Sequence, residues 1–315
     1  MSLPTRIKVP IPQDEHGYIG RECPIGDCEG YFKIKPGTGL KGKNLTCHCA
    51  YCGHTASHNQ FATKAQIAFV RSFAHRKIVN DLRDEFKKLE FDIKPKGLFG
   101  IGISVKLKPG TPIPLQRYRE GTLETHVTCS ECSLEYSVYG VFAFCPDCGK
   151  HNSFQILQKN IDLVQKQLAL AAAQTDGELK RHLIEDALEN CVSAFDGFAR
   201  EACRIGTRRT TGPAKYANLS FQNLPRAAAR VISLFGIDMT KAVSDEDWNH
   251  AHIAFMRRHV LAHRGGVIDR QYLIESGEPQ SLSGRRVVVI PADVERLANI
   301  LLKVGRQLVN DLSAQ

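Results

Sequence analysis

The 315-residue chain has no apolar run approaching the ~18–20 residues that a membrane-spanning helix needs. Its first ten residues, MSLPTRIKVP, lack the apolar stretch of a secretory signal. No G-x-G-x-x-G segment leads into a predicted helix, and no His-Glu-x-x-His motif is present. These absences argue against a membrane protein, a secreted protein, a dinucleotide-binding fingerprint and a helical zinc-hydrolase site. We therefore expect a cytoplasmic protein with no membrane partner.

Cysteine is plentiful by contrast, and eight of the eleven cysteines form four close pairs. Without an export signal, paired thiols favour metal binding over disulfides, because the cytosol is reducing. Two pairs with short spacing present four sulfurs to one tetrahedral Zn²⁺ ion. The sequence therefore predicts two structural Zn²⁺ sites and no catalytic metal. The predicted ligands of the first site are Cys23, Cys28, Cys49 and Cys52, and those of the second are Cys129, Cys132, Cys145 and Cys148.

The first cysteine set leaves a choice between two thiols. Cys47 lies two residues before Cys49, and either sulfur is available as the third ligand. We choose Cys49 because Cys49-Ala-Tyr-Cys52-Gly has the spacing of a zinc knuckle. Neighbouring histidines offer a further substitute ligand, although four cysteines already complete the shell; they are His48, His54 and His58. Two cysteines in apolar helical patterns are expected to be buried and inert: Cys191 and Cys203.

The charge balance is mildly basic. The formal net charge is +9, and eight thiolates with two Zn²⁺ ions would bring it to +5. Lys and Arg exceed Asp and Glu by 21 to 15 in residues 1–154, and by 21 to 18 in residues 155–315. This balance is compatible with a nucleic-acid partner and equally with an ordinary solvated surface. The glycine-rich loop 36–44 carries two lysines and is either a phosphate-tracking loop or a plain hairpin loop.

The fold class predicted for the chain is α+β and multidomain. Residues 1–60 form an N-terminal arm and the first ribbon, residues 61–121 a helix and strand connector, residues 122–154 the second ribbon, and residues 155–315 an all-α bundle. Strands are expected at 30–35 and 45–48, on the two sides of the loop, and in the second ribbon at 123–128 and 136–144. In the connector, apolar residues at steps of three and four predict a helix over 61–91, followed by a strand over 98–107 and a turn at 109–114.

The bundle should contain five helices, at 155–173, 177–204, 222–235, 244–263 and 291–312, with a short strand at 287–290. Ser244 is suited to cap the fourth helix, and Gly265-Gly266 to end it. That helix carries Arg257-Arg258-His259-Val-Leu-Ala-His263. His259 and His263 are four residues apart and share a helix face with His252.

Three interpretations of this stretch compete. The histidines could bind a metal, although no carboxylate of a His-Glu-x-x-His site accompanies them. The cations could simply suit the negative pole of the helix dipole. Alternatively, an imidazole could take the proton of a ribose 2′-hydroxyl while an arginine stabilises the charged phosphorane.

The third interpretation agrees with a family resemblance. Residues 155–315 resemble a HEPN domain, whose hallmark matches Arg258-His259-Val-Leu-Ala-His263 late in a helical bundle. The resemblance implies a metal-independent endoribonuclease, with Arg258 on phosphate, His263 in proton transfer and His259 as a polar helper. It also implies an RNA partner and a homodimer whose two motifs face one cleft. A defence or toxin role, with a regulatory protein partner, would suit such an architecture.

Two other functions stay open. The ribbons could bind nucleic acid or protein while the bundle only dimerises or docks, without catalysis. A zinc-dependent enzyme is disfavoured, because a four-cysteine shell leaves no open coordination position. Asp196 and Glu189 could approach the histidines as an orienting carboxylate, but a helix-surface charge is the plainer interpretation, and neither is assigned a role.

Overall fold

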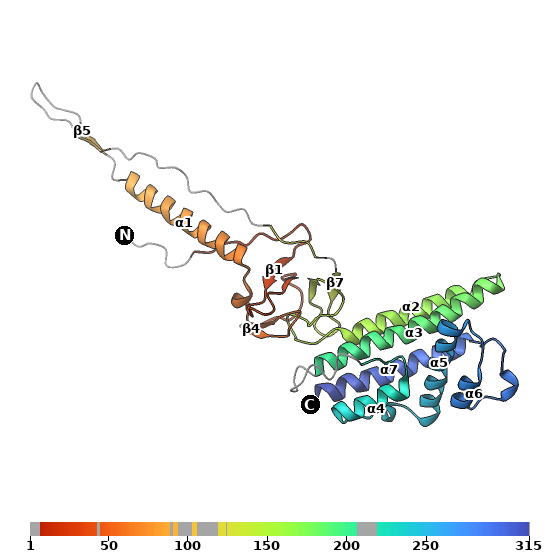
Figure 1. The fold of residues 1–315 in the computed structure, drawn as a ribbon. Coiled ribbons are helices and arrows are strands. Elements are labelled where there is room, and N and C mark those ends of the chain that lie inside the picture. The colour runs from red at the N-terminus through yellow and green to blue at the C-terminus, as the bar shows by residue number, and fades with distance from the viewer. Residues whose placement is uncertain are drawn as a thin grey trace, which may run out of the picture. The chain divides into compact units, whose positions relative to one another are not determined.

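The computed structural model describes residues 7–42, 45–88, 91–93, 103–105, 119–123, 125–206 and 219–314. The chain divides into two compact units, Met1–Lys150 and His151–Gln315 (Figure 1). The first unit contains small antiparallel sheets and one long helix, and the second consists of helices. The expected mixture of α and β structure is therefore present.

The first unit is built on a four-stranded antiparallel sheet in the order β1-β2-β8-β7. Its strands are β1 (Ile19–Glu22), β2 (Tyr31–Ile34), β7 (Thr125–Thr128) and β8 (Glu135–Val138). Strand β2 pairs with β8 through Lys33↔Ser137 and Ile34↔Tyr136. Because β2 belongs to the first cysteine ribbon and β8 to the second, the two ribbons share one sheet.

The expected hairpin across loop 36–44 is wrong. Strand β3 (Thr46–His48) follows the loop, but it pairs with β4 (Thr55–Ser57) instead of β2. Strand β8 also ends at Val138, well before the expected Phe144. Burial explains why β2 pairs with β8 instead of β3, because the apolar side chains of β2 and β8 face a common core. That core is formed by Phe32, Ile34, Phe61, Val127, Tyr136 and Val138, together with buried cysteines.

Helix α1 (Lys64–Lys87) begins and ends inside the range 61–91 expected for it. A capping box starts it, in which the Thr63 hydroxyl accepts from the Gln66 N–H and the Gln66 side chain accepts from the Thr63 N–H. Gln66 Nε2 also donates to the Gly20 carbonyl at 2.9 Å and so fixes the helix to β1. Beyond the helix, β5 (Phe91–Ile93) pairs with β6 (Ile103–Val105). The rest of the strand expected at 98–107, and the turn at 109–114, lie outside the described residues.

The second unit contains the five expected helices, each displaced by at most a few residues. They are α2 (Ser153–Ala172), α3 (Gly177–Gly206), α4 (Leu224–Phe235), α5 (Asp245–Arg264) and α7 (Pro291–Ser313). The short α6 (Arg270–Ser276) was not expected. The strand expected at 287–290 is wrong: a single bridge between Val267 and Arg286 takes its place. Helices α2 and α3 pack side by side, and α7 lies against α3 (Figure 1).

Helix α5 is held at both ends as its sequence predicts. The Ser244 hydroxyl accepts from the Asp247 N–H at 3.2 Å. Gly265 ends the helix at φ 60°, in the left-handed region, and its N–H donates to the Val260 carbonyl. The buried face of α5 joins the main core of the unit, to which all five long helices contribute. These caps fix the position of the last two turns, which carry His259 and His263.

Candidate functional site

Each of the four cysteine pairs folds into the same kind of tight turn. The first cysteine of every pair donates its N–H to a carbonyl a few residues past the second, with N···O distances of 2.8–3.0 Å. The residue directly after the second cysteine has a positive φ in all four turns. These residues are Glu29 (40°), Gly53 (71°), Ser133 (62°) and Gly149 (69°). Such a turn directs two sulfurs to the same side.

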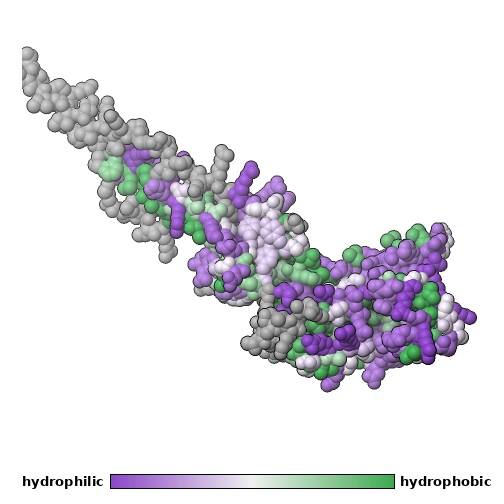
Figure 2. Space-filling view, viewed as in Figure 1, coloured by the Kyte–Doolittle hydropathy of each residue, from purple (hydrophilic) through white to green (hydrophobic). Residues whose placement is uncertain are grey.

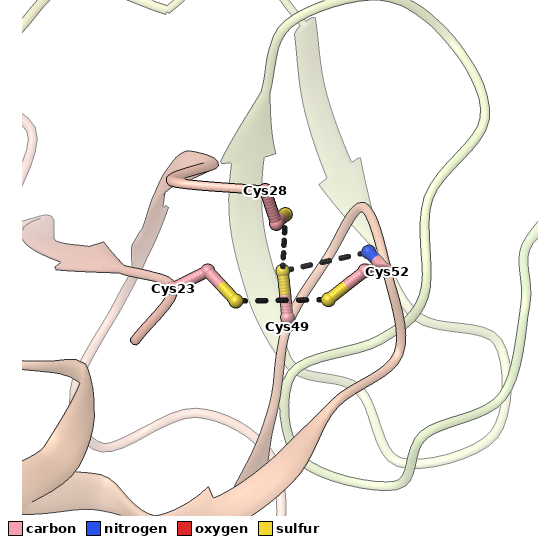
Figure 3. A group of neighbouring side chains, drawn as sticks. All are labelled: Cys23, Cys28, Cys49 and Cys52. Carbon is pink, nitrogen blue, oxygen red and sulfur yellow. Dashed lines mark hydrogen bonds between the residues drawn. The ribbon is translucent and has the colours of Figure 1, made fainter. Parts of the chain in front are cut away.

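The first four thiols lie at tetrahedral spacing (Figure 3). The sulfurs of Cys23 and Cys52 are 3.6 Å apart, and those of Cys28 and Cys49 are 3.7 Å apart. Metal–sulfur bonds of about 2.3 Å in a tetrahedron place sulfurs about 3.8 Å apart. A disulfide would need a separation of about 2.05 Å. The group therefore fits one metal ion and does not fit a pair of disulfides.

The second four thiols repeat this arrangement. Cys129 and Cys148 have sulfurs 3.7 Å apart, and Cys132 and Cys145 have sulfurs 3.5 Å apart. Backbone N–H groups donate to sulfur in both groups, as Glu131 does to Cys129 at 3.4 Å. Such donors stabilise thiolates over thiols. The eight cysteines predicted as ligands thus form two groups that could each hold a metal ion.

The cysteines outside these groups are buried and apart from them. Cys49, the thiol chosen from knuckle spacing, belongs to the first group, and Cys47 does not. Cys47 is fully buried, and burial raises the pKa of its thiol to about 12. Burial likewise raises the pKa of Cys191 and of Cys203 to about 12, as expected for inert thiols. His48, considered above as a substitute ligand, is outside both thiol groups and contacts Thr55, with Nδ1 and Oγ1 2.8 Å apart.

The glycine-rich loop lies against the second metal group over its described part, residues 36–42. The buried carboxylate of Asp147 accepts from the Leu40 N–H at 2.9 Å. The Thr38 hydroxyl accepts from the Glu135 N–H at 3.0 Å and donates to the Lys35 carbonyl at 2.7 Å. These contacts connect the two ribbons. Lys43, one of the two lysines expected to track phosphate, lies outside the described residues.

In the second unit, the structure brings His259 and His263 together. Their ring centroids are 4.8 Å apart, and both side chains are exposed. His252 lies two turns earlier on the same face and is half-buried. Among the residues that the structure describes, only the two cysteine groups have the geometry of a metal site. The interpretation of these histidines as metal ligands therefore has no structural support.

Arg258 lies elsewhere. Its side chain is 6% exposed, on the stripe of α5 that also buries Ala254 and Phe255. Its Nε has no hydrogen-bond partner within the described structure. On an ideal helix this stripe is about 140° from His263. The guanidinium and the imidazoles expected to act on one phosphate thus leave α5 on different faces.

Helices α4, α5 and α6 enclose a cleft of about 750 Å³. His252 and His259 line it from α5, Arg226 and Arg230 from α4, and Glu275 from α6. His263 and Arg258 are not among its lining residues. The three residues on α4 and α6 were missed in the sequence, because nothing in it indicates that these helices border α5.

The electrostatics of the cleft favour neutral imidazoles. Burial lowers the pKa of His252, and Glu275 opposes that effect. Partial desolvation also lowers the pKa of His259; the charges of His263, Arg264 and Arg258 lower it further, in that order, and Glu275 opposes them. His259 is therefore largely unprotonated at neutral pH and able to accept a proton.

The neighbouring charged groups have structural roles. Arg257 donates to Asp293 at 2.7 Å and to Glu278 at 2.9 Å, so it joins α5 to α7 and to the segment after α6. Asp196 is buried, accepts from the Phe221 N–H at 2.5 Å, and does not line the cleft. Glu189 is exposed on α3 and is also outside the cleft lining. The structure thus places neither carboxylate beside the histidines of the cleft.

Comparison of the chain with family models, with curated proteins and with solved structures found no match. No helix in the described part of the chain is both long enough and apolar enough to cross a membrane. The two thiol groups and the histidine-lined cleft are the features from which a function follows.

Proposed function

We propose that the chain is a metal-independent endoribonuclease, in which zinc ribbons bind or recognise RNA and a HEPN-like helical unit cuts it. The observation that carries the proposal is His259. The residue lines a cleft together with Arg226 and Arg230, its ring lies next to a second exposed imidazole, and its pKa is lowered. A neutral imidazole at an anion-binding cleft is the arrangement that general-base attack on a phosphodiester requires.

Zn²⁺ is the metal that we assign to both thiol groups. Four cysteine sulfurs at tetrahedral spacing suit Zn²⁺. When bound, the ion would crosslink two turns and neutralise part of the thiolate charge. Four sulfurs fill its coordination shell, so these sites stabilise the fold and leave the chemistry to other residues.

In this proposal the RNA is cut in the cleft. His259 takes the proton from a ribose 2′-hydroxyl, and O2′ attacks the adjacent phosphorus. The P–O5′ bond breaks, a protonated imidazole returns a proton to O5′, and the products are a 2′,3′-cyclic phosphate and a 5′-hydroxyl. Arg226 and Arg230 stabilise the negative charge on the phosphorane. His263, whose ring is 4.8 Å from that of His259, is the second proton carrier.

Arg258 acts through His259 in this proposal. The HEPN resemblance implies a phosphate-binding arginine, but the buried position of Arg258 keeps its side chain out of the cleft lining. Its positive charge instead helps to lower the pKa of His259. We therefore assign Arg258 as a positioning residue.

The burial of Arg258 also favours a second candidate function, in which the chain binds RNA without cutting it. If a buried guanidinium beside the histidines is only structural, the cleft still holds phosphate through Arg226 and Arg230. Such a protein would show salt-sensitive RNA binding and no new RNA ends.

A second copy of the chain is the other partner that we propose. Several exposed apolar side chains lie between the end of α5 and the start of α7. They include Val267 (48% exposed), Ile274 (67%), Val288 (71%) and Ile290 (49%). Figure 2 shows hydrophilic residues over much of the visible face of the helical unit, with hydrophobic residues among them. Pairing through this segment would cover these side chains, and light scattering of the purified chain measures it.

Total cellular RNA incubated with the purified chain and EDTA tests the function, with metal analysis confirming that both ions stay bound. We expect cleavage by the wild type, and a loss of about 100-fold or more in the His259→Ala variant. His263→Ala should also be slow, and Arg258→Ala should shift the pH profile. His182→Ala, at an exposed histidine of α3, is the matched control and should cut normally. Undiminished cutting by His259→Ala would rule out this mechanism, and binding without any cutting would favour the second function.

A further inference from the structure

The walls of the cleft differ in charge. Arg226 and Arg230 are one turn apart on α4, and the first turn of this helix, with its positive dipole end, lines the same wall. Across α5, the facing wall carries the carboxylates of Glu275 and Asp269. Asp269 is already paired with Arg264, which leaves Glu275 as the acidic group facing the histidines. A ligand that fits both walls has an anion at one end and hydrogen-bond donors at the other.

Between these charged walls, aromatic and apolar side chains supply part of the cleft lining. Phe255 and Tyr272 line it and are 3% exposed each, and the half-buried Met256 is a third lining residue of this kind. Flat aromatic and thioether surfaces bind planar heteroaromatic rings. A volume of about 750 Å³ is in the range of small-molecule sites, and it is too small for a nucleic-acid duplex.

We propose that this cleft binds one unstacked nucleotide, with its phosphate against Arg226 and Arg230 and the amino-bearing edge of its base against Glu275. The proposal rests on the proposed function and deepens it, because it makes cutting selective for the base. Single-stranded RNA is the form in which a base can leave its stack and enter such a site.

Glu275 sets the selectivity by its chemistry. An ionised carboxylate only accepts hydrogen bonds, and it has room for several. Oε1 already accepts from the amide of Gln271, so the remaining sites are available to a base. Adenine, guanine and cytosine each present an exocyclic amino group, whereas uracil has none and presents its single N3–H between two carbonyl oxygens. A carboxylate therefore binds the first three more strongly than the fourth, whose two carbonyls repel it on either side of the one donor.

Calorimetric binding of the four 5′-monophosphates AMP, GMP, CMP and UMP to the full-length wild type tests the proposal. At least one amino-bearing nucleotide should bind about tenfold or more tightly than UMP. Glu275→Gln should reduce that preference to less than about threefold, because an amide donates as well as accepts. Arg226→Ala should weaken all bound nucleotides together. The matched controls are Glu178→Gln and Arg181→Ala on the exposed face of α3, which should change nothing.

The outcomes separate the two proposals. Selective nucleotide binding without RNA cleavage would contradict the proposed nuclease activity and support the nucleotide site. If RNA is cleaved but the four nucleotides bind with equal affinity, and Glu275→Gln leaves these affinities unchanged, the base selectivity is contradicted and the nuclease activity is supported. No binding of any monophosphate at millimolar concentration would overturn the site itself. Circular dichroism of each variant shows that a loss of binding is not a loss of fold.

Discussion

Cys49 lies in a tight turn that presents its sulfur to three other thiols, whereas the thiol of Cys47, on strand β3, is buried outside the group. Cys49→Ala should therefore lower the metal content from two ions per chain to one. Cys47→Ala should keep both ions and cost only about 1 kcal/mol, for a small buried cavity. Metal analysis of the purified variants measures the difference. Equal loss of metal from both would contradict the assigned ligands.

Ser133 is in the left-handed region at φ 62°, although it has a side chain. This conformation costs an L-residue about 1–2 kcal/mol, and glycine avoids the cost while losing some chain entropy on folding. Ser133→Gly should therefore stabilise the first unit by about 0.5–1 kcal/mol. At the equivalent position of the next turn, Gly149→Ala should destabilise the unit. The residue has a φ of 69°, which disfavours a side chain, and the new methyl would lie 3.0 Å from His48. Thermal unfolding checks both signs, and a lower Tm for Ser133→Gly would contradict the turn geometry.

Helix α3 is held near its C-terminal end by Glu201. This carboxylate accepts two hydrogen bonds from Arg204, at 2.6 and 2.5 Å, and lies 3.4 Å from His151 at the start of the second unit. Burial alone would raise the pKa of Glu201, but the hydrogen bonds from Arg204 and His151 outweigh it and bring the pKa down to about 2. The ionised form is thus favoured in the folded state.

The pKa of Glu201 in the folded state lies below its ordinary value of 4.5, so its stabilising contribution is present above pH 4.5 and is lost as the pH falls towards 2. Glu201→Gln should destabilise the second unit at pH 7 by about 1–2 kcal/mol. The difference from the wild type should shrink below pH 4.5. Urea unfolding followed by fluorescence of Trp248, the single tryptophan, measures it. Glu178→Gln is the exposed control, and a difference that stays constant down to pH 2 would contradict this origin.

The helices could be predicted from the sequence because their signals are local. Ser244, Gly265 and the apolar steps of α5 lie within a few residues of the contacts they make. The pairing of β2 with β8 could not be predicted, since Lys33 and Ser137 are about a hundred residues apart and either ribbon alone satisfies the metal spacing. The short α6 has too few turns to show a period. The histidines of the site were found, but its arginines and Glu275 enter the cleft only through tertiary packing.

The two units of the molecule depend on different forces. The first has a small core in which buried cysteines are a large part, and the second has a continuous apolar core shared by five helices. Removal of metal by a strong chelator should therefore unfold Met1–Lys150 and leave His151–Gln315 folded. Hydrogen exchange should show lost protection in β1, β2, β7 and β8, while Trp248 fluorescence stays native. Simultaneous loss of structure in both units would contradict their independence.

The most direct test of the whole account compares two strands of identical sequence, one of RNA and one of 2′-O-methyl RNA, incubated with the chain in EDTA. A methyl on O2′ removes the proton that His259 is proposed to take and blocks the attacking oxygen. The account predicts that the RNA is cut to fragments ending in 2′,3′-cyclic phosphate and that the methylated strand stays whole. Cutting of both strands, or of neither while both bind, would contradict it.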